Sequence, residues 1–145
     1  MSTLVDTNVL LRRIQPRHGQ QGVAIESVAR LIETDEPVYF TLQNISEFWN
    51  VATRPLSGNG LDLSINRVQA EVEKIEQYLD LLPDTPAVYE EWRRLVFAHG
   101  VRGKKVHDAK LIATMNVHGV RRILTFDIGD FARYDIEAIH PGSLL

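Results

Sequence analysis

The 145-residue chain fits one domain, expected to span residues 1–145, and is long enough to fold without a disulfide or a structural metal. It contains no cysteine, which excludes thiolate zinc sites, iron–sulfur clusters, disulfide scaffolds and cysteine nucleophiles. Its net charge of −3 argues against a uniformly basic nucleic-acid-binding protein, so any contact with nucleic acid must depend on local basic patches.

The first part of the chain predicts two strands, each followed by a helix. A short apolar run at 3–5 indicates a buried strand, and residues 8–14 predict a brief helix. Apolar side chains then recur close to helical spacing at 20–33. A β-rich run at 38–41 precedes an apolar helical stripe at 45–52, which must end before the proline that follows it.

The rest of the chain continues this alternation after a loop at 57–60. Ser64 is a suitable N-cap for the helix that begins there, and glycines end the two helices that follow. We expect helices at residues 64–78, 87–99 and 106–118. We expect strands at residues 81–82, 122–125 and 136–139.

Strands that are separated by helices require crossover connections, which produce a parallel sheet covered on both faces. We therefore expect an α/β fold with three layers, α/β/α, and a central parallel sheet of four to five strands flanked by helices. In sheets of this kind, ligands bind beyond the carboxyl ends of the strands. The residues that follow each strand are therefore the first candidates for a functional site.

Acidic residues stand at these places. Asp6 directly follows the first expected strand, and Asp127 closely follows the fourth. Glu47 lies in the helix after the second strand. Asp108 opens the last expected helix, and its side chain is expected to project along the inward apolar stripe.

Each of these acids also has an ordinary structural explanation. Asp6 is a suitable helix N-cap, and Glu47 fits an exposed position on its helix. Asp108 fits a first turn, where a negative charge complements the helix dipole, and Asp127 fits a turn. All four acids can meet in one crevice at the carboxyl edge of the predicted sheet. Their occurrence together at this edge favours a shared function over four separate structural roles.

Several carboxylates within about 6 Å of one another repel, and a divalent cation removes that conflict. Ligands that are all oxygen favour Mg²⁺ or Mn²⁺, and the chain has no cysteine and no paired histidine motif that would indicate zinc. A metal held by carboxylates can lower the pKa of a bound water and steady the departing oxygen during phosphodiester cleavage.

Four short segments of the chain resemble the motifs of PIN-domain nucleases, especially the VapC-type toxins of bacterial toxin–antitoxin pairs. They occur in the family's order and spacing and cover essentially the whole chain. The segments are Leu-Val-Asp-Thr-Asn-Val-Leu-Leu at 4–11, Ser-Glu-Phe-Trp-Asn-Val at 46–51, His-Asp-Ala with Leu-Ile-Ala at 107–113, and Leu-Thr-Phe-Asp-Ile-Gly-Asp-Phe at 124–131.

The resemblance implies a PIN-like fold and a magnesium-dependent endoribonuclease, the toxin of a type II toxin–antitoxin system. The cofactor would be Mg²⁺, or Mn²⁺ in its place, held by the catalytic acids Asp6, Glu47, Asp108 and Asp127. The family position matched by Asp127 is often asparagine. Supporting roles next to these acids would belong to Thr7, Asn8, Thr125 and Asp130.

The resemblance also implies partners. Relatives act on RNA, commonly as homodimers, and an antitoxin holds them inactive by placing its tail in the acidic groove. The expected partners are therefore an RNA substrate, a cognate antitoxin protein and a second copy of the chain. No apolar stretch approaches the roughly 18 residues of a membrane-spanning helix, so we expect no membrane partner and a cytoplasmic location.

Basic residues near the motifs are candidates for substrate binding, because phosphates attract lysine and arginine without regard to base sequence. The loop before Asp108 carries Arg102, Lys104 and Lys105, and its alternative explanation is an ordinary solvated loop. Similar candidates flank the first two motifs at Arg12, Arg13, Arg17 and Arg54.

Other enzyme classes centred on aspartate fit the sequence less well. A haloacid-dehalogenase-type phosphatase needs a second aspartate two residues after the first, where this chain has Asn8. The glycine-rich signature of a nucleotide-binding P-loop is absent. The remaining alternative is a catalytically inactive PIN-fold protein that only binds RNA or an antitoxin partner.

Overall fold

The central strand of the sheet is β1 (Thr3–Val5), and all three of its residues are buried. β2 (Val38–Thr41) and β4 (Arg122–Leu124) flank it, while β3 (Asp80–Leu82) and β5 (Glu137–Ile139) form the edges. In the computed structural model, which describes all 145 residues, every strand pair is parallel and the order is β3-β2-β1-β4-β5. The five-stranded parallel sheet confirms the predicted α/β class.

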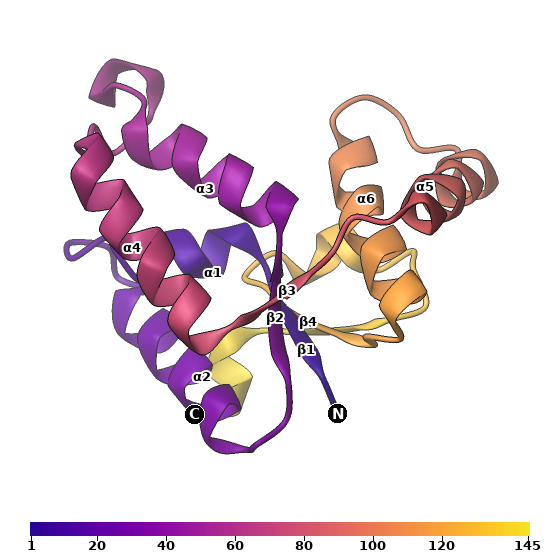
Figure 1. Cartoon of the computed structure of the whole chain (residues 1–145), viewed down its shortest axis with the longest axis horizontal. Helices are drawn as coiled ribbons and strands as arrows, with labels where there is room; N and C mark the ends of the chain where they lie inside the picture. Colours follow the sequence, from indigo (N-terminus) through magenta and orange to yellow (C-terminus); the bar gives the residue numbers. More distant parts are fainter.

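Helices cover both faces of this sheet (Figure 1). Because successive strand residues point to opposite faces, Val5 packs into the core shared with the first four helices, and Leu4 packs into the core shared with the last two. No helix combines the length and the apolar character that a membrane crossing requires. The helices are α1 (Thr7–Arg12), α2 (Gln21–Glu33), α3 (Leu42–Thr53), α4 (Ile65–Tyr78), α5 (Pro86–His99) and α6 (Lys105–His118).

Capping side chains explain where the helices begin and end. α4 starts after Ser64, whose hydroxyl accepts a hydrogen bond from the backbone N–H of Arg67, as predicted. α3 begins at Leu42, before its apolar stripe, because Thr41 and Asn44 form a reciprocal capping box. α5 and α6 are each followed by a glycine in the left-handed conformation, which glycine adopts readily because it has no Cβ.

The carboxyl ends of β1, β2 and β4 lie at the same edge of the sheet, because these strands run parallel. The register pairs Val5 with Leu124, and the backbone N–H of Asp6 continues the pairing by donating to the Leu124 carbonyl at 2.9 Å. The starts of α1 and α3 and the residues after β4 are therefore neighbours in space.

Candidate active site

A groove of about 490 Å³ opens at this edge of the sheet. It brings together the four predicted catalytic acids and Asp130, which was predicted to support them, so that its carboxylates are Asp6, Glu47, Asp108, Asp127 and Asp130. Thr7 and Asn8 also line it. Thr125 does not line the groove, because it is fully buried beneath the carboxylates.

Asp6 is the most deeply buried of these acids, with 9% of its surface exposed. One carboxylate oxygen, Oδ1, accepts from the backbone N–H of Thr7 at 2.7 Å and so caps α1. The other, Oδ2, accepts from the Thr125 hydroxyl at 2.8 Å. The structural explanation for Asp6 as an N-cap and its position in the groove are therefore both correct.

Burial raises the pKa of Asp6 from 3.8 to about 7. The hydrogen bonds from Thr125 and Thr7 oppose this rise, and the negative charges of Glu47 and Asp108 add to it. Asp6 therefore lies in the electrostatic field of two other acids of the groove.

The Thr125 hydroxyl connects three parts of the site. It donates its proton to Asp6, and its oxygen accepts from the Asn8 side-chain amide at 3.2 Å and from the Asp127 backbone N–H at 3.0 Å. A hydroxyl has one proton and two lone pairs, so the bonding capacity of this group is complete. The Asn8 amide also donates to Asp127 Oδ2 at 3.2 Å, which links the end of β4 to α1.

Asn44 is a supporting residue that the sequence analysis missed. Its side-chain Nδ2 donates to the Thr7 hydroxyl at 3.0 Å, and its Oδ1 accepts from the Thr41 backbone N–H at 2.9 Å. Asn44 is fully buried, so these bonds satisfy an amide that has no access to water. The signal that could have revealed it is a polar residue at the third position of a helix that starts directly after a strand.

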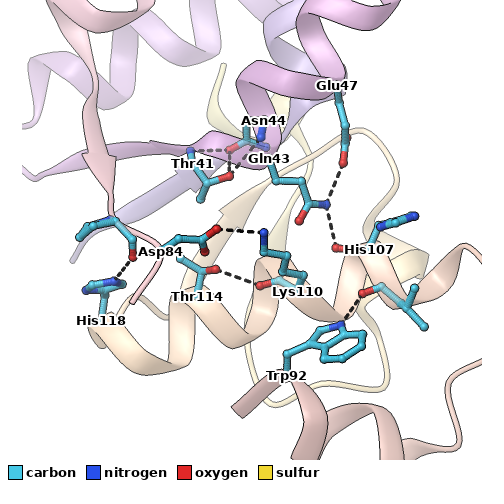
Figure 2. Close-up of polar contacts among 12 residues, drawn as sticks. Thr41, Gln43, Asn44, Glu47, Asp84, Trp92, His107, Lys110, Thr114 and His118 are labelled. Atoms are coloured by element: carbon cyan, nitrogen blue, oxygen red, sulfur yellow. Dashed lines mark hydrogen bonds and ion pairs between the residues drawn. The ribbon is translucent and has the colours of Figure 1, made fainter. Parts of the chain in front are cut away.

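Gln43 is a second residue that the sequence analysis missed, and Figure 2 shows its contacts. Its Nε2 donates to Glu47 Oε1 at 2.7 Å, one turn along α3, and to the His107 carbonyl of α6 at 2.8 Å. The side chain of Glu47 is thereby tied to the first turn of the helix that carries Asp108.

Asp108 is half-buried, and burial is the main reason that its pKa is raised. The negative charge of Asp130 adds to the rise, and Lys105 opposes it. Lys105 Nζ pairs with Asp130 Oδ1 at 3.1 Å. Arg102, Lys104 and Lys105 do not line the groove, whereas Arg12 and Arg54 do.

The donor set fits a hard divalent cation, because it consists of carboxylate oxygens and only one of its five acids, Asp130, forms an ion pair with a protein cation. None of the four predicted acids has a lysine, arginine or histidine nitrogen within salt-bridge distance, although Asp130 has Lys105. No three acidic or histidine side chains are close enough to enclose one ion in their present rotamers. Binding by three of them therefore requires side chains to turn further into the groove.

Comparisons with solved structures show similarity to chains from toxin–antitoxin systems. A chain of VapBC2 from Rickettsia felis, bound to a DNA fragment from its promoter, is 12% identical with a TM-score of 0.70, covering 97% of this chain and 98% of that one. VapC20 from Mycobacterium tuberculosis, a sarcin–ricin loop cleaving toxin, is 17% identical with a TM-score of 0.68, covering 93% and 97%. A chain of FitAcB from Neisseria gonorrhoeae is 24% identical with a TM-score of 0.64, covering 98% and 99%.

At these identities the solved structures establish the fold alone, and a comparison with curated proteins gives no match. The family model of the PIN domain matches residues 3–137. PIN domains are typically nucleases and usually depend on a metal. The match spans β1 through the first residue of β5 and includes every acid of the groove, so the chain belongs to the PIN-domain family.

Proposed function

We propose that the chain is a magnesium-dependent endoribonuclease and acts as the toxin of a type II toxin–antitoxin pair. The observation that carries this proposal is that four acids lie in one groove and none of them forms an ion pair with a protein cation; they are Asp6, Glu47, Asp108 and Asp127. Four carboxylates without a protein cation are stable together when a divalent ion binds among them. The similarity to VapC20, a sarcin–ricin loop cleaving toxin, supports RNA as the substrate.

Mg²⁺, or Mn²⁺ in its place, would be held by the four acids. When bound, such an ion lowers the pKa of water and neutralises charge on a phosphodiester during cleavage. Thr7 and Thr125 hold the Asp6 carboxylate in one orientation through its two hydrogen bonds. The Asn8 amide orients the Asp127 carboxylate, and the Gln43 amide orients the Glu47 carboxylate, each through one hydrogen bond. These contacts orient the acids before substrate binds.

An antitoxin protein and a second copy of the chain are the proposed partners. Similar solved structures come from toxin–antitoxin complexes, among them one from Klebsiella pneumoniae that is 16% identical with a TM-score of 0.65. An antitoxin that covers the groove would block access of RNA to the acids.

The test of the proposed activity is RNA cleavage by purified protein that is free of antitoxin. We expect cleavage with Mg²⁺, none in chelator, and none by Asp6→Asn or Asp108→Asn. Asp135→Asn is the matched control, because Asp135 is fully exposed and lies outside the groove. If the wild type were as inert as the two groove variants while still binding RNA, the chain would be a binding protein and the nuclease proposal would fail.

The substrate is found by sequencing the 5′ ends of cellular RNA after induced expression of the protein. Expression of Asp6→Asn is the control for background breakage. Ends that appear only with the wild type would identify the cleaved RNA and the bases around the cleaved bond.

A further inference from the structure

Two arginines line the same groove as the acids. Arg12 ends α1, and Arg54 directly follows α3. Asp6 caps the start of α1, and Glu47 lies seven residues before Arg54. At 1.5 Å per residue, each arginine backbone lies roughly 10 Å along its helix from the corresponding acid. The groove therefore has an acidic part near the sheet edge and a basic part at the far ends of α1 and α3.

No carboxylate neutralises either arginine. Arg12 donates from Nε to Gln20 Oε1 at 3.3 Å and from Nη1 to Gln15 Oε1 at 3.0 Å. Arg54 donates from Nη2 to the Asn59 carbonyl at 3.3 Å, and neither arginine takes part in a salt bridge. Neutral acceptors orient a guanidinium without cancelling its charge, so both arginines keep a full positive charge.

Arg54 also has an unused donor. Its Nε is buried and has no hydrogen-bond partner, although a buried polar group without a partner is costly. The carbonyl group and Cγ of Arg54 pack closely against Gly60, because a Cβ atom added at Gly60 would collide with them. An anionic ligand that induced a small rotation of the guanidinium would bring this donor into use.

A single RNA strand matches this distribution of charge. It carries one phosphate per nucleotide, so a phosphate held among the acids and their cation has neighbours that reach the basic part of the groove. Guanidinium groups bind phosphate oxygens through paired, charge-assisted hydrogen bonds. A peptide carboxylate would satisfy the arginines alone and would offer nothing to the acidic part.

We propose that Arg12 and Arg54 form a phosphate subsite that binds a backbone phosphate next to the cleaved one. This inference rests on the proposed ribonuclease function and adds the path of the strand, which runs along α1 and α3. The amide side chains of Gln15 and Asn50 also line the groove, and amide groups of this kind can hydrogen-bond an unstacked base.

The experiment measures binding of a labelled single-stranded RNA octamer by fluorescence anisotropy, with Ca²⁺ in place of Mg²⁺ to suppress cleavage. The variants are Arg12→Gln, Arg54→Gln, the double variant and the Arg12→Lys/Arg54→Lys double variant. The control is Arg93→Gln, which removes an unpaired arginine of α5 from a different depression of the surface. Thermal unfolding establishes that each variant folds.

We expect the Gln double variant to bind at least tenfold more weakly than the wild type. The plot of the logarithm of the RNA-binding constant against the logarithm of the salt concentration should become less steep, by about 0.7 for each lost phosphate contact. The Lys double variant should keep the slope and lose part of the affinity, while Arg93→Gln matches the wild type. A series of octamers, each with one uncharged methylphosphonate at a different position, tests which phosphate the arginines bind. At one position the methylphosphonate should weaken binding to the wild type but not to the Gln double variant.

Two results would overturn the subsite. One is equal RNA binding and equal salt slope for the wild type and the Gln double variant. The other is unchanged RNA binding together with lost binding of an acidic peptide, which would assign the arginines to a protein ligand. Both readouts are binding measurements without cleavage, so they decide the subsite even if the Mg²⁺ cleavage assay of the wild type fails.

Discussion

Gln43 and Glu47 lie one turn apart on α3, and the Gln43 amide donates to the Glu47 carboxylate at 2.7 Å. The same nitrogen donates to the His107 carbonyl at 2.8 Å, which is the only hydrogen bond that joins α3 to α6 (Figure 2). The Gln43 amide thus links the Glu47 carboxylate of α3 to α6, the helix that carries Asp108.

We therefore predict that Gln43→Leu lowers kcat/KM for RNA cleavage about tenfold, the value of one charged hydrogen bond. The Mg²⁺ concentration for half-maximal activity should rise, and the melting temperature of the metal-free protein should stay within a few degrees. The matched control is Gln69→Leu, because Gln69 makes the same kind of contact with Glu73 on α4. If Gln43→Leu changed the melting temperature but not the Mg²⁺ requirement, Gln43 would be a structural residue only.

Asp6 should make the metal-free protein less stable as the pH rises. The pKa of Asp6 is about 7 in the folded state and 3.8 without burial, so between these values the folded state binds more protons than the unfolded state. The contribution of Asp6 to the free energy of unfolding therefore falls as the pH rises from about 4 to 7, by on the order of 4 kcal/mol.

Urea unfolding in chelator at pH 5 and pH 8 measures this effect. The difference in unfolding free energy between the wild type and Asp6→Asn removes the contributions of groups that do not interact with Asp6. We expect the wild type to lose about 2–3 kcal/mol relative to the variant between pH 5 and pH 8, because these pH values include only the upper part of the range between the two pKa values of Asp6, 3.8 and about 7. If the unfolding free energies of the wild type and Asp6→Asn changed equally with pH, the Asp6 carboxylate would ionise in the folded state as easily as in the unfolded state.

Mg²⁺ should raise the stability of the wild type. A ligand that binds only the folded state at one hundred times its Kd adds about 2.7 kcal/mol to the free energy of unfolding. The rise should be larger at pH 8 than at pH 5, because protons compete with the ion for Asp6 and Asp108. Asp108→Asn should lose most of the rise, and absence of any rise in the wild type would contradict the metal site.

Thr125→Val should lower the free energy of unfolding by about 2 kcal/mol, because it leaves the partners of a buried hydroxyl without their hydrogen bonds. Thr125→Ser keeps the hydroxyl and should stay close to the wild type. The control is Thr114→Val, since Thr114 is equally buried but donates only to a carbonyl of its own helix. Urea unfolding at pH 8 measures all three, and equal losses for Thr125→Val and Thr114→Val would remove the special role of Thr125.

The sequence predicted the fold and the location of the acids because both depend on local patterns. Asp6 directly follows a buried strand and Asp127 closely follows another, so the parallel topology alone brings them to one edge. The predicted helix at 8–14 begins instead at Thr7 and ends at Arg12, because the Asp6 cap starts it earlier. The predicted strands at 81–82, 122–125 and 136–139 differ by one residue at one end from the observed strands β3, β4 and β5, so the errors lie at the ends of elements.

The supporting contacts could not be predicted, because they depend on which groups meet after folding. Gln43 bonds to a carbonyl 64 residues away, and nothing in its own helix indicates that partner. The basic loop before Asp108 is close to it in sequence, yet Lys105 pairs with Asp130 and Arg102 stays outside the groove. Arg12 and Arg54 line the groove because α1 and α3 pack side by side.

The two oxygens of Asp6 are each engaged by one internal donor, the Thr7 amide and the Thr125 hydroxyl. Each oxygen therefore retains a single lone pair for anything that enters from outside. A small-molecule inhibitor that needed both lone pairs of either oxygen would have to uncap α1 or detach the end of β4. Compounds that approach one oxygen and reach toward the guanidinium groups at the far end are the more practical chemical starting points.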